Sequence, residues 1–390
     1  MKKHILKRIM IIILLCFPLN IKAYDSASSS IVMDIDTGRI LYAKNIHEKR
    51  LIASITKVMT AIITIENTDI NNQIEIGNEI LSMYGTNIYI EVGEVIKIED
   101  LLYGLMLRSG NDSAVSLAKY IGKTEENFIK LMNMKAKNIG MNSTKFENPH
   151  GLDDETKNYS TAYDMALLSK YAYQNNTYKK IAKTKKYTAK TVNKTYLWYN
   201  RNKLLDEYQY CTGGKNGYTP SAGKTLITTA EKNGQRLTIV TLNDKDNYEN
   251  HRKLYENAFA KYKNYTIIDK DKFKMNKKIY KNEAYIKKSF TYPLTEEEYK
   301  SITTSIIINK KSNPMEKLGY INIKLKDEII GKIDIYIKDT KKEEISFLQK
   351  IQNYLLDNLK KFKLGLQNNL NPGASVPRPL EIKRLESLML

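Results

Sequence analysis

Alternating apolar positions near the start and after the middle of the chain predict β-strands. Apolar residues alternate through 31–35, Asp36-Thr37-Gly38 has the composition of a turn, and the apolar pattern resumes over 40–43. Period-two alternation interrupted by a glycine-containing turn is typical of two antiparallel strands. Residues 226–229 and 237–242 are further strand-like runs.

Between these two regions the chain has a helical pattern. Residues 54–66 contain few helix breakers, and 101–107 and 113–121 are two more helical segments, separated by Arg108-Ser109-Gly110-Asn111. Ser160 precedes a further helical run and is its expected N-cap. Strands at both ends of a helical middle predict an α+β domain over 24–262, whose sheet is closed by its N- and C-terminal strands.

The composition and the hydrophobic pattern of the sequence change near Tyr262. Residues 265–340 are rich in Lys and Ile and alternate in polarity, which predicts a small all-β domain with few catalytic residue types. In 343–366, apolar residues recur every three or four positions among several lysines. A basic amphipathic helix of this kind is typical of an anchor on an anionic membrane surface, and a helix packed on its own β-domain is the alternative.

The two ends of the chain have unusual compositions. Residues 1–23 resemble a secretory signal peptide, with a positive start, an apolar run over 9–19 that is short for a membrane span, and the small Ala23 at the expected cleavage site. An uncleaved anchor is the alternative. Residues 371–390 hold three of the 8 prolines and fit either a disordered tail or a non-native fusion scar. We therefore expect an exported protein at the outer face of the cytoplasmic membrane or in the cell wall.

Charge and cysteine content narrow the possible partners. The 390 residues are 27% charged and 42% hydrophobic, which is globular, and 63 Lys+Arg against 43 Asp+Glu give a net charge of +20. An exported basic protein meets anionic wall polymers and lipid head groups, so we expect no nucleic-acid partner. Of the 2 cysteines, Cys16 lies in the signal peptide, so Cys211 has no partner for an internal disulfide.

The first chemically suggestive motif is Ser54-Ile55-Thr56-Lys57. Residues three apart share one face of a helix, so the Ser54 hydroxyl would lie beside the Lys57 amine. Serine is a weak nucleophile until a base takes its proton, and lysine is a base only when burial or a neighbouring cation keeps it neutral. Alone, so short a pattern occurs by chance in many chains.

Two further motifs change that assessment. Ser109-Gly110-Asn111 can present a hydroxyl and an amide from a loop between helices, although it also suits an ordinary turn. Lys215-Asn216-Gly217 would place Lys215 and Gly217 on one side of an edge strand, where the lysine attracts a substrate carboxylate and the glycine leaves room for substrate backbone. Its alternative is a glycine-rich hairpin. In this order the three motifs match the S-x-x-K, S-D-N and K-T-G set of penicillin-binding proteins and class A β-lactamases.

Over roughly residues 29–262 the chain resembles the serine-type D-alanyl-D-alanine carboxypeptidases, the low-molecular-mass penicillin-binding proteins of the SxxK acyltransferase family. Beyond the three motifs, the resemblance rests on residues 31–42, 53–60, 100–115, 148–152 and 160–162. It implies a β-lactamase/transpeptidase-like fold, with an antiparallel sheet between helices and a helical subdomain. The region after Tyr262 resembles the small β-domain and amphipathic tail of these enzymes in pattern only.

The resemblance also implies a reaction. Ser54 would attack the carbonyl between the two terminal D-alanines of a peptidoglycan stem pentapeptide, Lys57 would accept its proton, and Ser109 would relay a proton to the leaving amine. Water would then hydrolyse the acyl-enzyme. Penicillin mimics the D-Ala-D-Ala end and would trap the ester, and the reaction needs no metal or organic cofactor.

Substrate binding is implied in the same way. Asn111 would hold the substrate backbone, and Lys215 would bind the terminal carboxylate beside Asn216 and Gly217. The backbone N–H groups of Ser54 and Tyr218 would form the oxyanion hole. Asn216 departs from the family pattern, which has Thr at that position, so reduced or altered activity is expected as one consequence.

Several competing functions remain. A class A β-lactamase would need an E-x-x-x-N segment between Asn111 and Lys215, and the sequence has none. A Ser-His-Asp hydrolase would need a triad histidine, and Ser54 lies in no G-x-S-x-G elbow. A phosphate loop at Gly217–Thr225 has five residues between its glycines where four are required. A wall- or membrane-binding module with a silent site is the non-enzymatic alternative, supported by Asn216.

Overall fold

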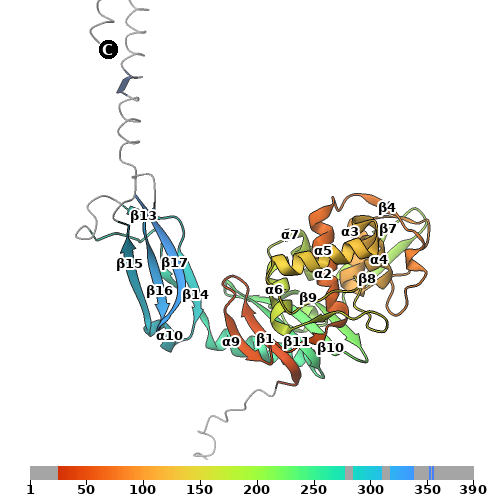
Figure 1. Ribbon diagram of the computed structural model, residues 1–390, viewed down its shortest axis with the longest axis horizontal. Coiled ribbons are helices and arrows are strands. Elements are labelled where there is room, and N and C mark those ends of the chain that lie inside the picture. The colour runs from red at the N-terminus through yellow and green to blue at the C-terminus, as the bar shows by residue number, and fades with distance from the viewer. Residues whose placement is uncertain (1–24, 277–283, 310–316, 338–350, 353, 355–390) are drawn as a thin grey trace, which may run out of the picture. The chain divides into compact units, whose positions relative to one another are not determined.

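The computed structural model describes residues 25–276, 284–309, 317–337, 351–352 and 354. By its internal contacts the chain divides into two units (Figure 1). The first extends to Thr266 and also takes in Thr291–Ser301, and the second contains Ile267–Phe290 and the residues from Ile302 onward. The predicted signal peptide and the tail of 371–390 lie outside the described residues, as does the amphipathic helix of 343–366 apart from three of its positions.

The centre of the first unit is a five-stranded antiparallel sheet with strand order β2-β1-β11-β10-β9. Its strands are β1 (Ala27–Asp34), β2 (Ile40–Lys44), β9 (Cys211–Thr219), β10 (Gly223–Lys232) and β11 (Gln235–Asp244). The N-terminal hairpin joins the C-terminal strands through β1 and β11, where Ile31 pairs with Val240. The predicted closure of one sheet by the two ends of the domain is therefore present.

Helices cover both faces of this sheet. Side chains of β1 point alternately into two hydrophobic cores, one on each face. Ile31 and Met33 pack with helix α6 (Ala162–Ala172), whereas Val32 packs with helix α9 (Asn247–Lys261) on the other face (Figure 1). Both faces of β1 are buried accordingly. The predicted α+β class is confirmed.

A helical subdomain lies beside the sheet. It is built on helices α2 (Lys57–Asn67), α3 (Ile98–Tyr103), α4 (Asn111–Gly122), α5 (Glu125–Asn138) and α7 (Asn176–Lys183). Short elements complete the unit: η1 (Ala53–Thr56), η2 (Asn78–Ile80), η3 (Gly104–Arg108), α8 (Leu204–Glu207), α10 (Glu296–Lys300), and the strand pairs β3 (Arg50–Leu51) with β6 (Tyr159–Ser160), β4 (Gln73–Glu75) with β5 (Val95–Lys97) and β7 (Lys186–Lys190) with β8 (Thr195–Tyr199).

Two helix boundaries differ from the sequence prediction. The N-cap of α6 is Thr161, whose Oγ1 accepts a hydrogen bond from the Asp164 N–H at 3.0 Å, and not Ser160. Ser160 instead belongs to β6, and its hydroxyl bonds that of Thr144 at 2.7 Å. The helix expected to end at residue 107 changes at Gly104 into the π-helical turn η3, a form often found at functional sites.

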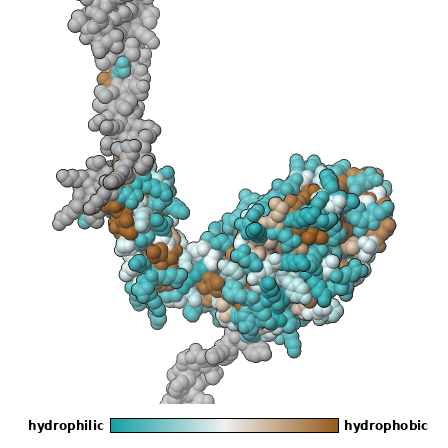
Figure 2. All heavy atoms as spheres, in the orientation of Figure 1, coloured by the Kyte–Doolittle hydropathy of each residue, from teal (hydrophilic) through white to brown (hydrophobic). Residues whose placement is uncertain are grey.

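The second unit contains a four-stranded antiparallel sheet with strand order β13-β17-β16-β15. Its strands are β13 (Ala284–Ile286), β15 (Ile302–Ile308), β16 (Lys317–Leu325) and β17 (Glu328–Ile337). A separate pair joins β12 (Lys263–Ile268) to β14 (Phe290–Leu294), and most residues of both strands belong to the first unit. Isoleucines dominate its core, as the alternating pattern predicts. The surfaces visible in Figure 2 are mainly hydrophilic, with small apolar patches. Among the described residues, no helix has the length and apolarity needed to cross a membrane.

Candidate active site

The predicted nucleophile lies where a tight turn enters a buried helix. Ser54 is in the 3₁₀ turn η1, which runs directly into α2 at Lys57. This geometry brings the Lys57 Nζ to 3.0 Å from the Ser54 Oγ. Ala53, just before the serine, has φ of +48°, a left-handed conformation that strains an alanine. The strained turn therefore holds the hydroxyl against the lysine.

The Lys57 amine is completely buried and bonded only to neutral oxygens. Besides Ser54, its Nζ contacts Asn111 Oδ1 and the His150 carbonyl oxygen, each at 2.7 Å. Burial lowers the pKa of Lys57 well below its ordinary value, and the charge of Lys215 lowers it further. The arrangement favours a neutral amine, which can accept a proton.

The second motif forms the opposite wall of the site. Ser109 is buried and left-handed, with φ of +68°, at the end of η3, and Asn111 is the first residue of α4. The Asn111 Nδ2 donates to the Tyr84 carbonyl oxygen at 2.7 Å, which turns its Oδ1 toward Lys57. The loop thus brings an oriented Asn111 amide to Lys57, and Ser109 lies two residues before Asn111 in the same loop.

The third motif lies on β9, which is an edge strand of the sheet as expected. Lys215 is 1% exposed, and burial, with the charge of Arg201, lowers its pKa to about 7. Its Nζ donates to the Asn216 carbonyl oxygen at 2.6 Å and lies 3.4 Å from the Asn216 Oδ1. The side chain at the unusual position 216 therefore faces the amine that is expected to bind the carboxylate.

Gly217 fixes how closely β9 approaches the nucleophile. A Cβ at this position would lie 2.7 Å from the Ser54 nitrogen and 2.6 Å from the Thr225 Oγ1, closer than side chains pack. Gly151, with φ of +91°, is equally constrained, since its Cβ would lie 2.0 Å from the Ala53 carbonyl oxygen. Tyr218, the next residue on β9, is 65% exposed at the rim.

Sequence reasoning missed two charged residues of this site. Arg201 lowers the pKa of both Lys57 and Lys215, and its Nη1 donates to the Thr86 Oγ1 at 3.2 Å. Asp112 accepts backbone N–H bonds from Ile88 and Tyr89 and so holds residues 84–94, which we call the wall segment. Asp112 stands beside Asn111 in the block quoted for the resemblance, whereas nothing in the sequence around Arg201 marks it.

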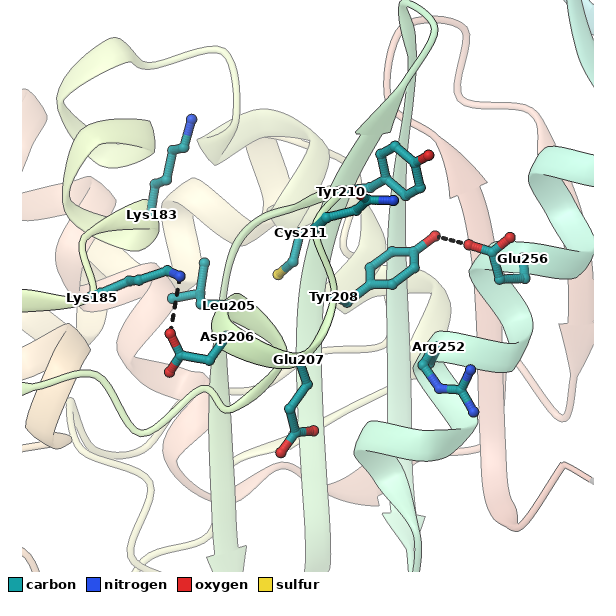
Figure 3. A pocket seen from close by; sticks show the side chains of 11 residues that line it. Lys183, Lys185, Leu205, Asp206, Glu207, Tyr208, Tyr210, Cys211, Arg252 and Glu256 are labelled. Carbon is teal, nitrogen blue, oxygen red and sulfur yellow. Dashed lines mark hydrogen bonds and ion pairs between the residues drawn. The ribbon is translucent and has the colours of Figure 1, made fainter.

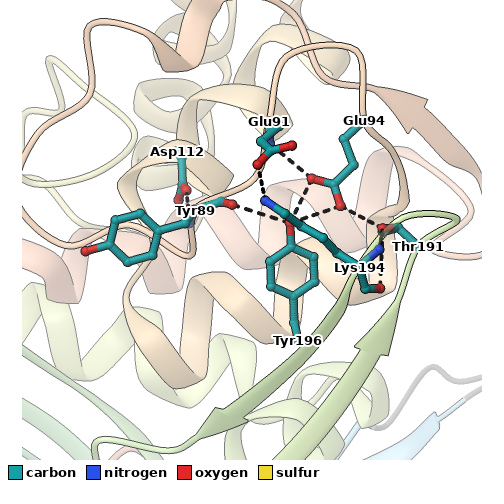
Figure 4. Close-up of polar contacts among 7 residues, drawn as sticks. All are labelled: Tyr89, Glu91, Glu94, Asp112, Thr191, Lys194 and Tyr196. Atoms are coloured by element: carbon teal, nitrogen blue, oxygen red, sulfur yellow. Dashed lines mark hydrogen bonds and ion pairs between the residues drawn. The ribbon is translucent and has the colours of Figure 1, made fainter.

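A polar network ties the wall segment to the β7–β8 hairpin (Figure 4). The Glu94 carboxylate accepts hydrogen bonds from the Tyr196 hydroxyl and from the Thr191 Oγ1, each at 2.8 Å. Lys194 pairs with Glu91, and the Tyr196 hydroxyl also reaches the Tyr89 carbonyl oxygen at 3.4 Å. The segment from Tyr84 to Glu94 is therefore held by side-chain bonds although it contains little regular structure.

The two buried histidines do not support a Ser-His-Asp triad. Burial lowers the pKa of both His150 and His251 to about 3. The His251 ring lies between the hydroxyls of Thr228 and Thr241, at 2.7 and 3.0 Å, and the His150 Nδ1 accepts the Leu152 N–H. Within the part of the chain that the structure describes, no group of His, Cys, Asp and Glu is arranged to hold a metal ion.

A cavity of about 680 Å³ lies at the other end of β9 (Figure 3). Its lining mixes both charges with tyrosines, and the ion pair Lys185–Asp206, at 3.0 Å, and the Tyr208–Glu256 hydrogen bond, at 2.7 Å, hold several of these side chains. Cys211 at its edge is buried and free, and burial raises the pKa of its thiol to about 11. None of the residues of the three motifs lines this cavity.

Comparison with known proteins agrees with the geometry. The family model described as D-alanyl-D-alanine carboxypeptidase matches residues 21–246. The D-alanyl-D-alanine carboxypeptidase DacF of Bacillus subtilis is 31% identical over 319 residues, covering 79% of this chain and 78% of that protein.

Solved structures show the same fold. The D-alanyl-D-alanine carboxypeptidase DacD of Francisella tularensis matches with a TM-score of 0.64 and 26% identity, covering 80% of this chain and 93% of that one. Penicillin binding protein 6B of Escherichia coli matches with a TM-score of 0.65 and 25% identity, covering 80% of this chain and 96% of that one. The resemblance predicted from the sequence is confirmed, and the chain belongs to the D-alanyl-D-alanine carboxypeptidase family of serine peptidases.

Proposed function

We propose that this chain removes the terminal D-alanine from peptidoglycan stem pentapeptides through an acyl-enzyme on Ser54. The observation that carries the proposal is the buried Lys57 amine, 3.0 Å from the Ser54 Oγ and bonded only to neutral oxygens. A buried lysine without a bonded carboxylate is poised to be a base at neutral pH.

The contacts of Lys57 orient it for this role. A neutral amine has two N–H donors and one lone pair. Asn111 Oδ1 and the His150 carbonyl oxygen can only accept, so they take the two donors. The lone pair is left to face the Ser54 hydroxyl. As the Ser54 oxygen bonds to the scissile carbonyl carbon, its proton passes to the Lys57 nitrogen.

Collapse of the resulting tetrahedral intermediate breaks the bond to the terminal D-alanine. The leaving amine takes up a proton, which we assign to a relay from Lys57 through the Ser109 hydroxyl. Water then attacks the ester as Lys57 accepts its proton, and Lys57 passes that proton to the Ser54 oxygen when the ester bond breaks, which restores both residues. Gly217 supports an oxyanion hole formed by the Ser54 and Tyr218 N–H groups, because it brings β9 against the Ser54 backbone.

Charge supports recognition of a C-terminal carboxylate. Lys215 and Arg201 are close enough for the arginine to lower the lysine pKa, and a bound carboxylate would relieve that repulsion. Asn111 would bind the substrate backbone, while Asn216 would donate from its amide in place of the family threonine. β-Lactam antibiotics carry a carboxylate and a strained amide, so the same site would bind and retain them.

The place of action is part of the proposal. Extracytoplasmic action suits an enzyme of the cell wall and the predicted signal peptide over 1–23. We further propose that the basic amphipathic segment 343–366 binds anionic membrane. The full-length protein should sediment with membranes, and a variant lacking 343–390 should stay in the supernatant. Unchanged sedimentation of that variant would contradict the anchor.

Intact mass after incubation with penicillin, followed by peptide mapping, tests the central proposal. A penicilloyl adduct on the Ser54 peptide together with D-alanine release from a pentapeptide is the expected result. An adduct without D-alanine release would favour the silent-site alternative, and rapid destruction of penicillin without a stable adduct would favour a β-lactamase.

A further inference from the structure

Three exposed tyrosines belong to the two segments, 84–94 and β9, that contact residues of the proposed active site. Tyr84 and Tyr89 are 51% and 73% exposed on the wall segment, and Tyr218 is 65% exposed on β9. Backbone contacts tie each of these residues to the motif residues or to their neighbours. The Tyr84 carbonyl oxygen binds Asn111, the Tyr89 N–H binds Asp112 at 2.8 Å, and Tyr218 directly follows Gly217.

Tyr89 is in an unfavourable backbone conformation for its type. Its φ is +63°, in the left-handed region, where glycine or asparagine is at ease and a bulky residue is strained. Because the ring is 73% exposed, burial does not compensate for this strain. Residues held in such conformations cluster at functional sites, so the ring itself needs an explanation.

The wall segment is held firmly enough to present these rings. Asp112, Tyr196 and the surrounding network fix the backbone at Tyr89, and Figure 4 shows its ring pointing away from that network. The Tyr84 hydroxyl is held by Asp154. A fixed aromatic side chain loses little conformational entropy on binding, which is why tyrosine is common at recognition surfaces.

The spacing of apolar and polar groups indicates the chemistry of the partner. Gly85, Thr86 and Asn87 separate Tyr84 from Tyr89, and the intervening Ile88 is buried. Exposed tyrosine rings suit a chain of sugar rings, whose C–H faces stack on aromatics while the hydroxyls stay in water. Leu81 and Val92 are also exposed near these tyrosines in sequence, so an acyl chain is the competing ligand that the experiment below must distinguish.

We propose that Tyr89, with Tyr84 and Tyr218, forms a platform that binds the glycan strand to which the stem peptide is attached. This inference rests on the proposed function, because a stem peptide seated at Ser54 continues covalently into a sugar polymer. The platform would make glycan-linked pentapeptide a better substrate than the free peptide.

The experiment compares wild type, Tyr89→Asn and Tyr89→Phe on two substrates, free pentapeptide and pentapeptide linked to glycan strands. Wild type should have the higher kcat/KM on the linked substrate. Tyr89→Asn should reduce that value about five- to tenfold and leave free-peptide activity unchanged, while Tyr89→Phe keeps the ring and the preference. Asparagine tolerates the left-handed backbone, so the Tm of Tyr89→Asn should be equal or higher.

Peptide-free glycan strands give a second readout that does not depend on catalysis. They should bind wild type and Tyr89→Phe but not Tyr89→Asn. The platform would be overturned if Tyr89→Asn lost activity equally on both substrates, or if wild type did not prefer the linked peptide. It would also be overturned if Tyr89→Asn lost binding to phosphatidylglycerol vesicles and kept its binding to glycan. Glycan binding without D-alanine release would refute the proposed function and leave the platform standing.

Discussion

The proposed active site and the cavity of Figure 3 lie at opposite ends of β9, and both collect lysines. In the active site, Lys57 and Lys215 are 0% and 1% exposed and bond to neutral oxygens. In the cavity, Lys185 is 59% exposed and pairs with Asp206. Lysine amines are therefore isolated from water and carboxylates in the active site, whereas the Lys185 amine of the cavity is exposed and paired with a carboxylate.

The two regions also differ in what lies beside their nucleophilic side chains. Ser54 has a buried amine 3.0 Å away. Cys211 is intrinsically the better nucleophile, yet burial raises the pKa of its thiol to about 11, and its neighbours are the Asn202 amide and the Gly213 carbonyl oxygen. Position beside a desolvated base, and not residue type, distinguishes the two.

The largest effect should come from replacing the serine of this pair, with replacement of the cysteine as the control. Ser54→Ala removes the oxygen on which we propose that the acyl-enzyme forms, so D-alanine release should fall by at least about 10⁴-fold and the penicilloyl adduct should disappear. Cys211→Ser is the matched control and should leave both unchanged. The measurements are the rate of D-alanine release and the intact mass after incubation with penicillin. A residual adduct on Ser54→Ala would show that another residue is the nucleophile.

A second effect concerns stability. The folded pKa of Lys215, about 7, lies below its ordinary 10.5, so the unfolded chain binds the proton more tightly. The destabilisation is complete below pH 7 and disappears as pH rises from 7 to 10.5. Lys215→Met should therefore abolish activity on carboxylate substrates and yet raise the free energy of unfolding at pH 6 by about 1–4 kcal/mol.

The control for that prediction comes from the cavity. Lys185→Met breaks an exposed ion pair and should change the free energy of unfolding by no more than about 0.5 kcal/mol. Denaturant unfolding of both variants at pH 6 and pH 9 is the measurement. An unchanged or lower stability of Lys215→Met at pH 6 would show that Lys215 is not destabilising in the fold.

The pH dependence of kcat/KM should reveal the two buried lysines separately. Lys57 must be neutral to accept the serine proton, so activity should fall as pH drops through its lowered pKa. Lys215 must be charged to bind a carboxylate, so activity on a free-acid pentapeptide should fall above pH about 7, by up to about tenfold per unit. An amide-capped peptide should show only the acidic limb, and an alkaline fall for both substrates would contradict the role of Lys215.

Local spacing explains which parts of this molecule the sequence predicts. Ser54 and Lys57 meet because they are three residues apart at a helix start, and Lys215 and Gly217 share a strand face. Arg201 joins them only through tertiary packing, which no local pattern records. Ser160 was the wrong N-cap because pairing of β6 with β3 places it in a strand, a contact between distant segments.

The same limit applies to the wall of the site. The left-handed Tyr89 follows from backbone bonds to Asp112, 23 residues away in sequence, and from the β7–β8 hairpin. A tyrosine in a loop of polar residues gives no sign of its conformation or exposure. Motifs thus locate the chemistry, whereas the surfaces that select the substrate depend on the folded chain.

The smallest effect should come from Asn216→Thr, which changes hydrogen bonding beside Lys215 without changing charge. The Asn216 Oδ1 lies 3.4 Å from the Lys215 Nζ and competes weakly with a substrate carboxylate for that amine. A threonine hydroxyl would replace the amide as donor to the carboxylate and remove the competing oxygen, so kcat/KM for the free-acid pentapeptide should rise about two- to fivefold. The amide-capped peptide should not respond, since it lacks the carboxylate. Buried lysines, and not one hydrogen bond at position 216, distinguish the active site from the cavity. A rise of a hundredfold or more would therefore make Asn216 a larger determinant of activity than the isolation of the lysines.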